Sequence, residues 1–305
     1  MPTQRPPTLD PRAAARWLHA APPASSPWLH EEVGRRMEQR LQWIVAQPRR
    51  WIDWQPLRGG VEAHRLVARR YPQAVCDVVE ATAAQAAQAR QALGAAWWHP
   101  GRWRGGATAF TSAPETLADG SADMVWANMA LHAAADPQAL IGQWHRLLAT
   151  DGYLMFSCLG PDSLRELHAV YTTLGWPPAG SAFTDMHDWG DMLVHAGFAE
   201  PVMDMERIVL TYETADRLLD DLRGLGRNLH PGRFPGLRGR RFRQRLCYAL
   251  TERLAVPGEG GRLALTFEIV YGHAFKPVPR ARLAPESAVS LGEMRSMLRR
   301  GRDGG

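Results

Sequence analysis

Lysine is almost absent from this chain of 305 residues, in which Lys276 is the only lysine among 36 lysine and arginine residues. The chain is instead rich in Ala, Arg, Pro, Gly and Trp, a usage typical of a GC-rich genome. The net charge of +5 could suggest an acidic partner, but this residue usage indicates a bias in codons rather than binding chemistry. The arginines are not interleaved with aromatic residues in a nucleic-acid-binding motif, which disfavours nucleic acid as the partner.

Cysteine and long hydrophobic runs are also scarce, and each shortage excludes a class of protein. Cys76, Cys158 and Cys247 are far apart and lack metal-ligand spacing, so they predict reduced core thiols and neither a disulfide framework nor a metal site. No apolar run reaches the length of a membrane span, and Met1 to Asp10 carries polar residues and prolines where a signal peptide needs an apolar core. We therefore expect a cytoplasmic protein without membrane contact.

The remaining composition, 45% hydrophobic and 22% charged, is that of a globular protein with one sizeable core. The composition changes along the chain and predicts three segments, and no internal repeat is evident. Residues 1–27 are rich in proline and alanine and predict a loosely ordered arm. Residues 28–277 form the main domain. Residues 278–305 are basic and predict a disordered tail.

The segment Ser121–Gly160 predicts a strand, a helix and a second strand. Its first apolar run ends at Asn128, apolar residues then recur at helical spacing, and Asp151-Gly152 precedes a run with the composition of a buried strand. Upstream, Arg50–Trp54 and 74–80 also predict strands. This alternation predicts an α/β fold, a Rossmann-like parallel sheet with helices on both faces and ligands at the carboxyl ends of its strands.

The later segments predict strands at 201–205, 206–211 and 263–271. Two helices, at 214–226 and 240–255, precede the last strand and are separated by a loop rich in Pro, Gly and Arg. This pair predicts a helical lid at about 214–256.

The central segment resembles that of class I S-adenosylmethionine (SAM) methyltransferases. More specific motifs resemble the BioC family, malonyl-[acyl-carrier-protein] O-methyltransferases of biotin synthesis, and the related complex I assembly methyltransferases of mitochondria. The resemblance extends from about Trp28 to Pro277. Those motifs are FTDMHDWGDMLVHAGF at 183–198, PVMDME at 201–206, LTY at 210–212 and FEIVYGHAFKP at 267–277.

This resemblance implies a SAM site at the strand ends. Asp53 matches the acid that ends the first strand, Glu80 the acid that binds the ribose, and Ser112 stands where an Asp commonly meets the adenine. A strand-end Glu such as Glu80 could equally be a solvated turn residue. The implied cofactor-binding residues are Asp53, Gly59, Gly60, Glu80, Ser112, Asn128 and Ala130.

The glycine loop departs from the family pattern. The family reads roughly VLDLGCGTG at this place, whereas this chain has Gln55-Pro-Leu-Arg-Gly-Gly-Val-Glu62. Pro56 and Arg58 replace residues that would leave the backbone open to a ligand, and proline removes a backbone donor. The loop is a poor copy of the cofactor cradle and predicts weakened SAM binding.

The reaction that the resemblance implies is transfer of a methyl group to the free carboxylate of a malonyl thioester. A carboxylate is already ionised at neutral pH, so it needs donors to position it and no general base. The catalytic candidates are His132, Arg165, Tyr271 and His273. Each has a structural alternative: His132 as a strand cap, Arg165 as a surface residue, and the other two as packing partners.

Six arginines between Arg233 and Arg245 suggest a partner surface. They are either a solvated loop and helix start or a patch that docks an acidic acyl carrier protein. Two functions remain: an active SAM-dependent O-methyltransferase, or a non-catalytic protein that kept the methyltransferase fold and a partner surface after losing SAM binding. A methyl acceptor other than a malonyl group is also compatible with the sequence, and the oligomeric state is not predicted.

Overall fold

The computed structural model describes residues 9–94, 107–258 and 260–278. Apart from Val278, the predicted disordered tail lies outside these residues, as do the first eight residues of the predicted arm. Within the described residues, seven strands form one sheet of order β3-β2-β1-β4-β5-β7-β6. The strands are β1 Arg50–Trp54, β2 Val75–Val79, β3 Thr108–Thr111, β4 Ala122–Ala127, β5 Leu148–Leu159, β6 Ala199–Tyr212 and β7 Leu263–Phe275.

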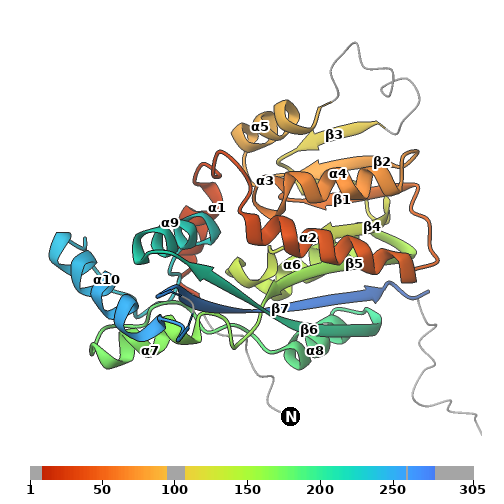
Figure 1. The fold of residues 1–305 in the computed structure, drawn as a ribbon. Helices are drawn as coiled ribbons and strands as arrows, with labels where there is room; N and C mark the ends of the chain where they lie inside the picture. Colours follow the sequence, from red (N-terminus) through yellow and green to blue (C-terminus); the bar gives the residue numbers. More distant parts are fainter. Residues whose placement is uncertain (1–8, 95–106, 259, 279–305) are drawn as a thin grey trace, which may run out of the picture.

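The sheet is the middle of three layers (Figure 1). Side chains alternate along each strand, so Trp51 and Trp126 join a cluster with α2 and α4, whereas Ile52 and Val125 join a second cluster with α6 and α8. This burial on both faces is what a parallel sheet requires and confirms the predicted α/β class. The helices outside the lid are α1 Pro11–His19, α2 Trp28–Arg40, α3 Pro56–Gly59, α4 Val61–Arg70, α5 Ala83–Leu93, α6 Pro137–Leu147 and α8 Met186–His195.

The last two strands are antiparallel to their neighbours. β7 pairs antiparallel with both β5 and β6. The sequence predicted two strands, at 201–205 and 206–211. The structure has one strand, β6, that includes both segments. Pro201 does not end it because β6 is at the edge of the sheet and its pairing shifts register between Ala199 and Val202, so the missing donor costs no ladder hydrogen bond.

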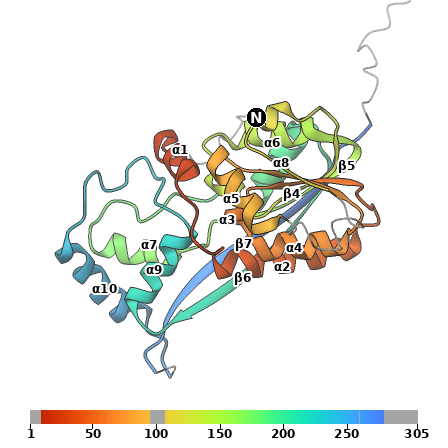
Figure 2. The ribbon, with the colours of Figure 1, turned by 90° about the horizontal axis from the view of Figure 1, so that it is seen from above.

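Three helices, α7 Arg165–Thr173, α9 Ala215–Leu225 and α10 Arg240–Leu254, form a group beyond the carboxyl edge of the parallel strands (Figure 2). α10 contacts α7, α9 and β7. α9 and α10 occupy the segment predicted as a lid. We call α7, α9, α10 and the loop 226–239 the lid.

The described part of the N-terminal arm, residues 9–27, contains α1 and contacts the lid. Asp10 begins α1 by accepting hydrogen bonds from the backbone N–H groups of Arg12 and Ala13. Ala13 and Ala14 are buried, and they cluster with Leu229 of the lid. None of the helices in the described part of the chain combines the length and apolar character needed to cross a membrane.

Candidate functional site

Two neighbouring places at the carboxyl edge of the sheet contain some of the predicted site residues. The first, which we call the strand-end niche, surrounds Asp53, the loop 55–60, Glu80 and Asn128. The second is a cavity of about 510 Å³ between the lid and the sheet, which we call the lid cavity.

The loop of the strand-end niche folds into a compact turn. Gln55 has a left-handed backbone (φ 59°), a conformation that glycine adopts more easily, and Pro56 then starts the short helix α3. A Cβ on Gly59 would lie 2.7 Å from the carbonyl oxygen of Asn128. Gly59 therefore permits a close contact within the protein, since the loop lies directly against Asn128.

The polar groups of the niche are bound by the chain itself. The side-chain amide of Asn128 donates to the carbonyls of His30, at 2.8 Å, and of Gly59. Its Oδ1 accepts from Ser157 Oγ at 2.6 Å. At the first turn of α4, the carboxylate of Glu31 accepts from the backbone N–H groups of Glu62 and Ala63. A helix N-terminus is a natural anion site, and here a protein carboxylate fills it.

The two strand-end acids are also bound internally. Glu80 is 3% exposed, and its Oε1 accepts from the backbone N–H of Leu57 at 2.9 Å. Burial raises the pKa of Glu80 to about 7, against the lowering effect of this hydrogen bond. Asp53 is buried and forms a 2.7 Å hydrogen bond with Nδ1 of His64, and burial raises the pKa of Asp53.

Arg58 joins the niche to the N-terminal arm. Its Nη2 donates to the carbonyls of Trp17, at 2.9 Å, and Ala20, at 2.7 Å, and its guanidinium lies 3.9 Å from the centre of the Trp17 ring. Gln85 holds the same stretch, donating to the carbonyls of Leu18 and Ala20. A hollow of about 20 Å³ beside Trp17, His30 and Arg58 is scarcely larger than one water molecule.

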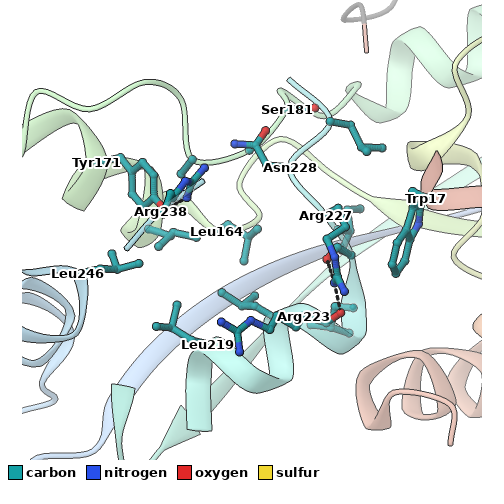
Figure 3. Close-up of a pocket in the computed structure, with 18 of the residues that line it drawn as sticks. Trp17, Leu164, Tyr171, Ser181, Leu219, Arg223, Arg227, Asn228, Arg238 and Leu246 are labelled. Atoms are coloured by element: carbon teal, nitrogen blue, oxygen red, sulfur yellow. Dashed lines mark hydrogen bonds between the residues drawn. The ribbon is translucent and has the colours of Figure 1, made fainter. Parts of the chain in front are cut away.

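The lid cavity is apolar with a basic lining (Figure 3). Its walls come from α1, α7, α9, α10, β5, β7 and the loops between them, and they include Leu164, Leu167, Phe242 and Phe267. Within the described residues its lining contains no Asp or Glu, but it contains five arginines. These are Arg223, Arg227, Arg238, Arg240 and Arg243.

Arg227 has no acidic partner among the described residues. It donates to the carbonyls of Arg223 and Gly226, and its guanidinium lies 5.2 Å from the Trp17 ring centre (Figure 3). Burial and the nearby charge of Arg223 lower the pKa of Arg227. Ser181, which also lines the cavity, is 7% exposed and its buried hydroxyl has no partner. These groups can donate to an anion without first breaking an ion pair.

Among the four predicted catalytic residues, only His132 lines the lid cavity. Burial lowers the pKa of His132 to about 3, so its ring is neutral at neutral pH and does not supply a cation. Arg165 is largely exposed beside Asp162 and Glu166, and the Tyr271 hydroxyl donates to Glu206. His273 lies on β7 beside Phe275. Their positions provide no support for catalytic roles of Arg165, Tyr271 and His273.

The predicted cofactor residues lie together more closely. Asp53, Gly59, Gly60, Glu80 and Asn128 all belong to the strand-end niche, since β1, β2 and β4 are adjacent. Ser112 follows β3 and is half-buried, and Ala130 precedes the turn that contains His132. Neither of these two lines the lid cavity. Trp17, Ser181 and Arg227 line the lid cavity but were not predicted as site residues. The available signal in the sequence was a pair of arginines four residues apart, Arg223 and Arg227, at the end of a predicted helix.

Comparisons with known proteins agree with this geometry. Residues 58–156 match the methyltransferase domain family. The crystal structure of a Bacillus halodurans protein assigned as a methyltransferase shares the fold, with a TM-score of 0.55 at 15% identity over 81% of this chain and all of that chain. The chain therefore contains a methyltransferase domain and has a fold that it shares with that protein.

The sequence relatives are more specific. The malonyl-[acyl-carrier protein] O-methyltransferase of Gallionella capsiferriformans is 40% identical over 83% of this chain and 85% of its own length. That of Laribacter hongkongensis is 39% identical over 89% and 88%. The chain therefore belongs to the malonyl-[acyl-carrier protein] O-methyltransferase family, which confirms the predicted resemblance.

SAM, the methyl donor of class I methyltransferases, does not fit the strand-end niche in this structure. The Leu57 N–H already donates to Oε1 of Glu80, and Nδ2 of Asn128 donates to two backbone carbonyls. The adjacent hollow of about 20 Å³ compares with about 300 Å³ or more for small-molecule sites. The residue types that the family uses are partly retained, but the chain's own groups fill the space between them.

Proposed function

We propose that the lid cavity binds the malonyl group of an acyl carrier protein, and that the chain serves O-methylation of its free carboxylate, with SAM as donor, in biotin synthesis. The names of the relatives supply the substrate. The observation that carries the proposal is a cavity with five arginines and no acidic residue among its described lining. We place the activity in the cytoplasm, since the buried free thiols Cys76 and Cys158 suit a reducing compartment.

The cavity supplies what such an acceptor requires. Arg227 and the unpartnered hydroxyl of Ser181 offer donors that would hold one carboxylate oxygen and leave the other free to react. The leucine and phenylalanine walls exclude water from the thioester and its pantetheine arm, which strengthens these polar contacts. Orientation and desolvation are the two contributions that a displacement by an already ionised carboxylate needs.

The test is titration of the protein with malonyl-pantetheine, followed by an assay of methyl transfer from labelled SAM to malonyl-carrier protein. We expect Arg227→Ala to weaken malonyl-pantetheine binding at least tenfold, because the charge-assisted hydrogen bonds between its guanidinium and the malonyl carboxylate are lost. Arg217→Ala, on helix α9 before the loop that carries Arg227 and outside the lid cavity, is the control and should bind as the wild type does. Equal dissociation constants for Arg227→Ala and the control would contradict the proposal.

A second candidate function is favoured by the filled strand-end niche. In this alternative the chain binds the malonyl-carrier protein without methylating it and acts through that partner. The methyl-transfer assay separates the two, because the alternative predicts malonyl-pantetheine binding with no labelled ester even at millimolar SAM.

A further inference from the structure

We infer that Arg58 and residues 17–20 of the N-terminal arm form a plug that closes the donor site, so that SAM binds only when this plug is displaced. The inference concerns the strand-end niche alone and does not depend on the identity of the acceptor. It rests on contacts that link three separate segments: the arm, the altered glycine loop and the start of α5.

The plug is held from two sides. Arg58 donates to the Trp17 and Ala20 carbonyls from the loop, and Gln85 donates to the Leu18 and Ala20 carbonyls from α5. Together these side chains make four hydrogen bonds to the stretch 17–20. A further bond, from Nδ1 of His30 to the Arg58 carbonyl at 2.7 Å, fixes the loop itself. Hydrogen bonds therefore hold this part of the arm against the glycine loop and α5, beside the niche.

The plug fills space beside the niche, and it also brings a positive charge there. SAM carries a positive sulfonium, whereas the niche already contains the half-buried guanidinium of Arg58 packed on Trp17. Burial lowers the pKa of Arg58, and the Glu80 carboxylate opposes that shift. A second cation beside Arg58 would be repelled by its guanidinium. Displacement of Arg58 would remove this repulsion and open space for a cationic donor.

The plug also contains two buried polar atoms without partners, which lowers the free energy needed to displace it. Nη1 of Arg58 and Oε1 of Gln85 are buried without hydrogen-bond partners. An unpartnered buried polar atom destabilises the closed arrangement. Trp17 lines both the hollow beside Arg58 and the lid cavity, as do His132, Ala133 and Leu225, so these residues lie between the donor and acceptor sides.

Isothermal titration with SAM and with S-adenosylhomocysteine tests the plug. We expect the wild-type protein to bind both ligands weakly, with dissociation constants of about 1 mM, and Arg58→Ala combined with Gln85→Ala to bind them at least tenfold more tightly. Trp17→Ala provides a second way to loosen the plug and should shift binding in the same direction. Arg65→Ala, an exposed residue of α4, is the matched control and should behave as the wild type.

Micromolar binding by the wild type would overturn the inference, and so would equal affinities for the wild type and both plug variants. Thermal unfolding of each variant establishes that it is folded before titration. Malonyl-pantetheine is titrated into the same samples. Loss of malonyl-pantetheine binding alone contradicts the proposed acceptor, whereas the donor titration alone decides the plug.

Discussion

At the scale of single residues, Glu80 shows how the niche has been rebuilt. The sequence placed this carboxylate correctly at the end of a strand, because strand periodicity fixes where β2 stops. The sequence did not reveal its partner, since the Leu57 N–H comes from 23 residues earlier and only the folded loop brings it within reach. The same holds for Asn128, whose partner His30 is 98 residues away.

The raised pKa of Glu80 predicts a pH-dependent stability. Folded protein keeps Glu80 protonated up to about pH 7, whereas the unfolded chain releases the proton near pH 4.5. The folded state therefore binds the extra proton in this window, and the contribution of Glu80 to stability falls as pH rises from 4.5 to 7. Glu80→Gln removes this dependence while keeping an acceptor for Leu57. We expect its stability relative to wild type to rise by about 2–3 kcal/mol between pH 5 and pH 8.

Urea unfolding of the wild type and Glu80→Gln at both pH values measures this change. A difference in unfolding free energy that stays constant between pH 5 and pH 8 would show that Glu80 titrates normally. Glu62→Gln, on the exposed side of α4, serves as the comparison for an unburied carboxylate.

At the scale of elements, the packing of α2 on α4 positions the whole niche. Gly34 makes this possible, because a Cβ at its position would lie 2.4 Å from the Cβ of Ala63. The sequence of α2 identifies its buried face, since apolar residues recur every three or four positions. It did not show that Gly34 sets the distance between the helices, because the contact depends on α4.

We expect Gly34→Ala to destabilise the protein by about 1–3 kcal/mol, because the added methyl group forces the two helices apart. Gly142→Ala is the matched control, since Gly142 is also within a helix but a Cβ there would meet nothing within 4 Å. The control should stabilise the protein by up to about 1 kcal/mol. Thermal unfolding of both variants checks this, and equal midpoints for the two would refute the close contact.

At the scale of the whole molecule, the lid and the sheet jointly create the cavity. Its walls come from segments between Trp17 and Phe267, so no local pattern could predict it. The sequence did predict the helices of the lid and its arginine-rich stretch, because helical periodicity and composition are local properties. The partner for that stretch remains a prediction.

If the lid docks an acidic carrier protein, its exposed arginines should steer association. We expect Arg240→Ala combined with Arg241→Ala to slow binding of malonyl-carrier protein severalfold at low salt, with the difference disappearing at high salt. Stopped-flow association rates measure this. The pair Arg65→Ala and Arg69→Ala changes the net charge equally on α4 and should leave the rate near the wild-type value. Equal slowing by both pairs would indicate net charge and not a docking patch.

The edge strand β6 has a consequence for how this protein behaves in concentrated solution. A long outer strand with exposed Val202 and Val209 offers unpaired backbone groups that another chain could extend into a shared sheet. Pro201 lacks one of those donors, and the register shift beside it interrupts the regular edge. Asp204, Glu206 and Arg207 add charges along the same strand. The proline, the register shift and the charges thus protect the protein against edge-to-edge aggregation.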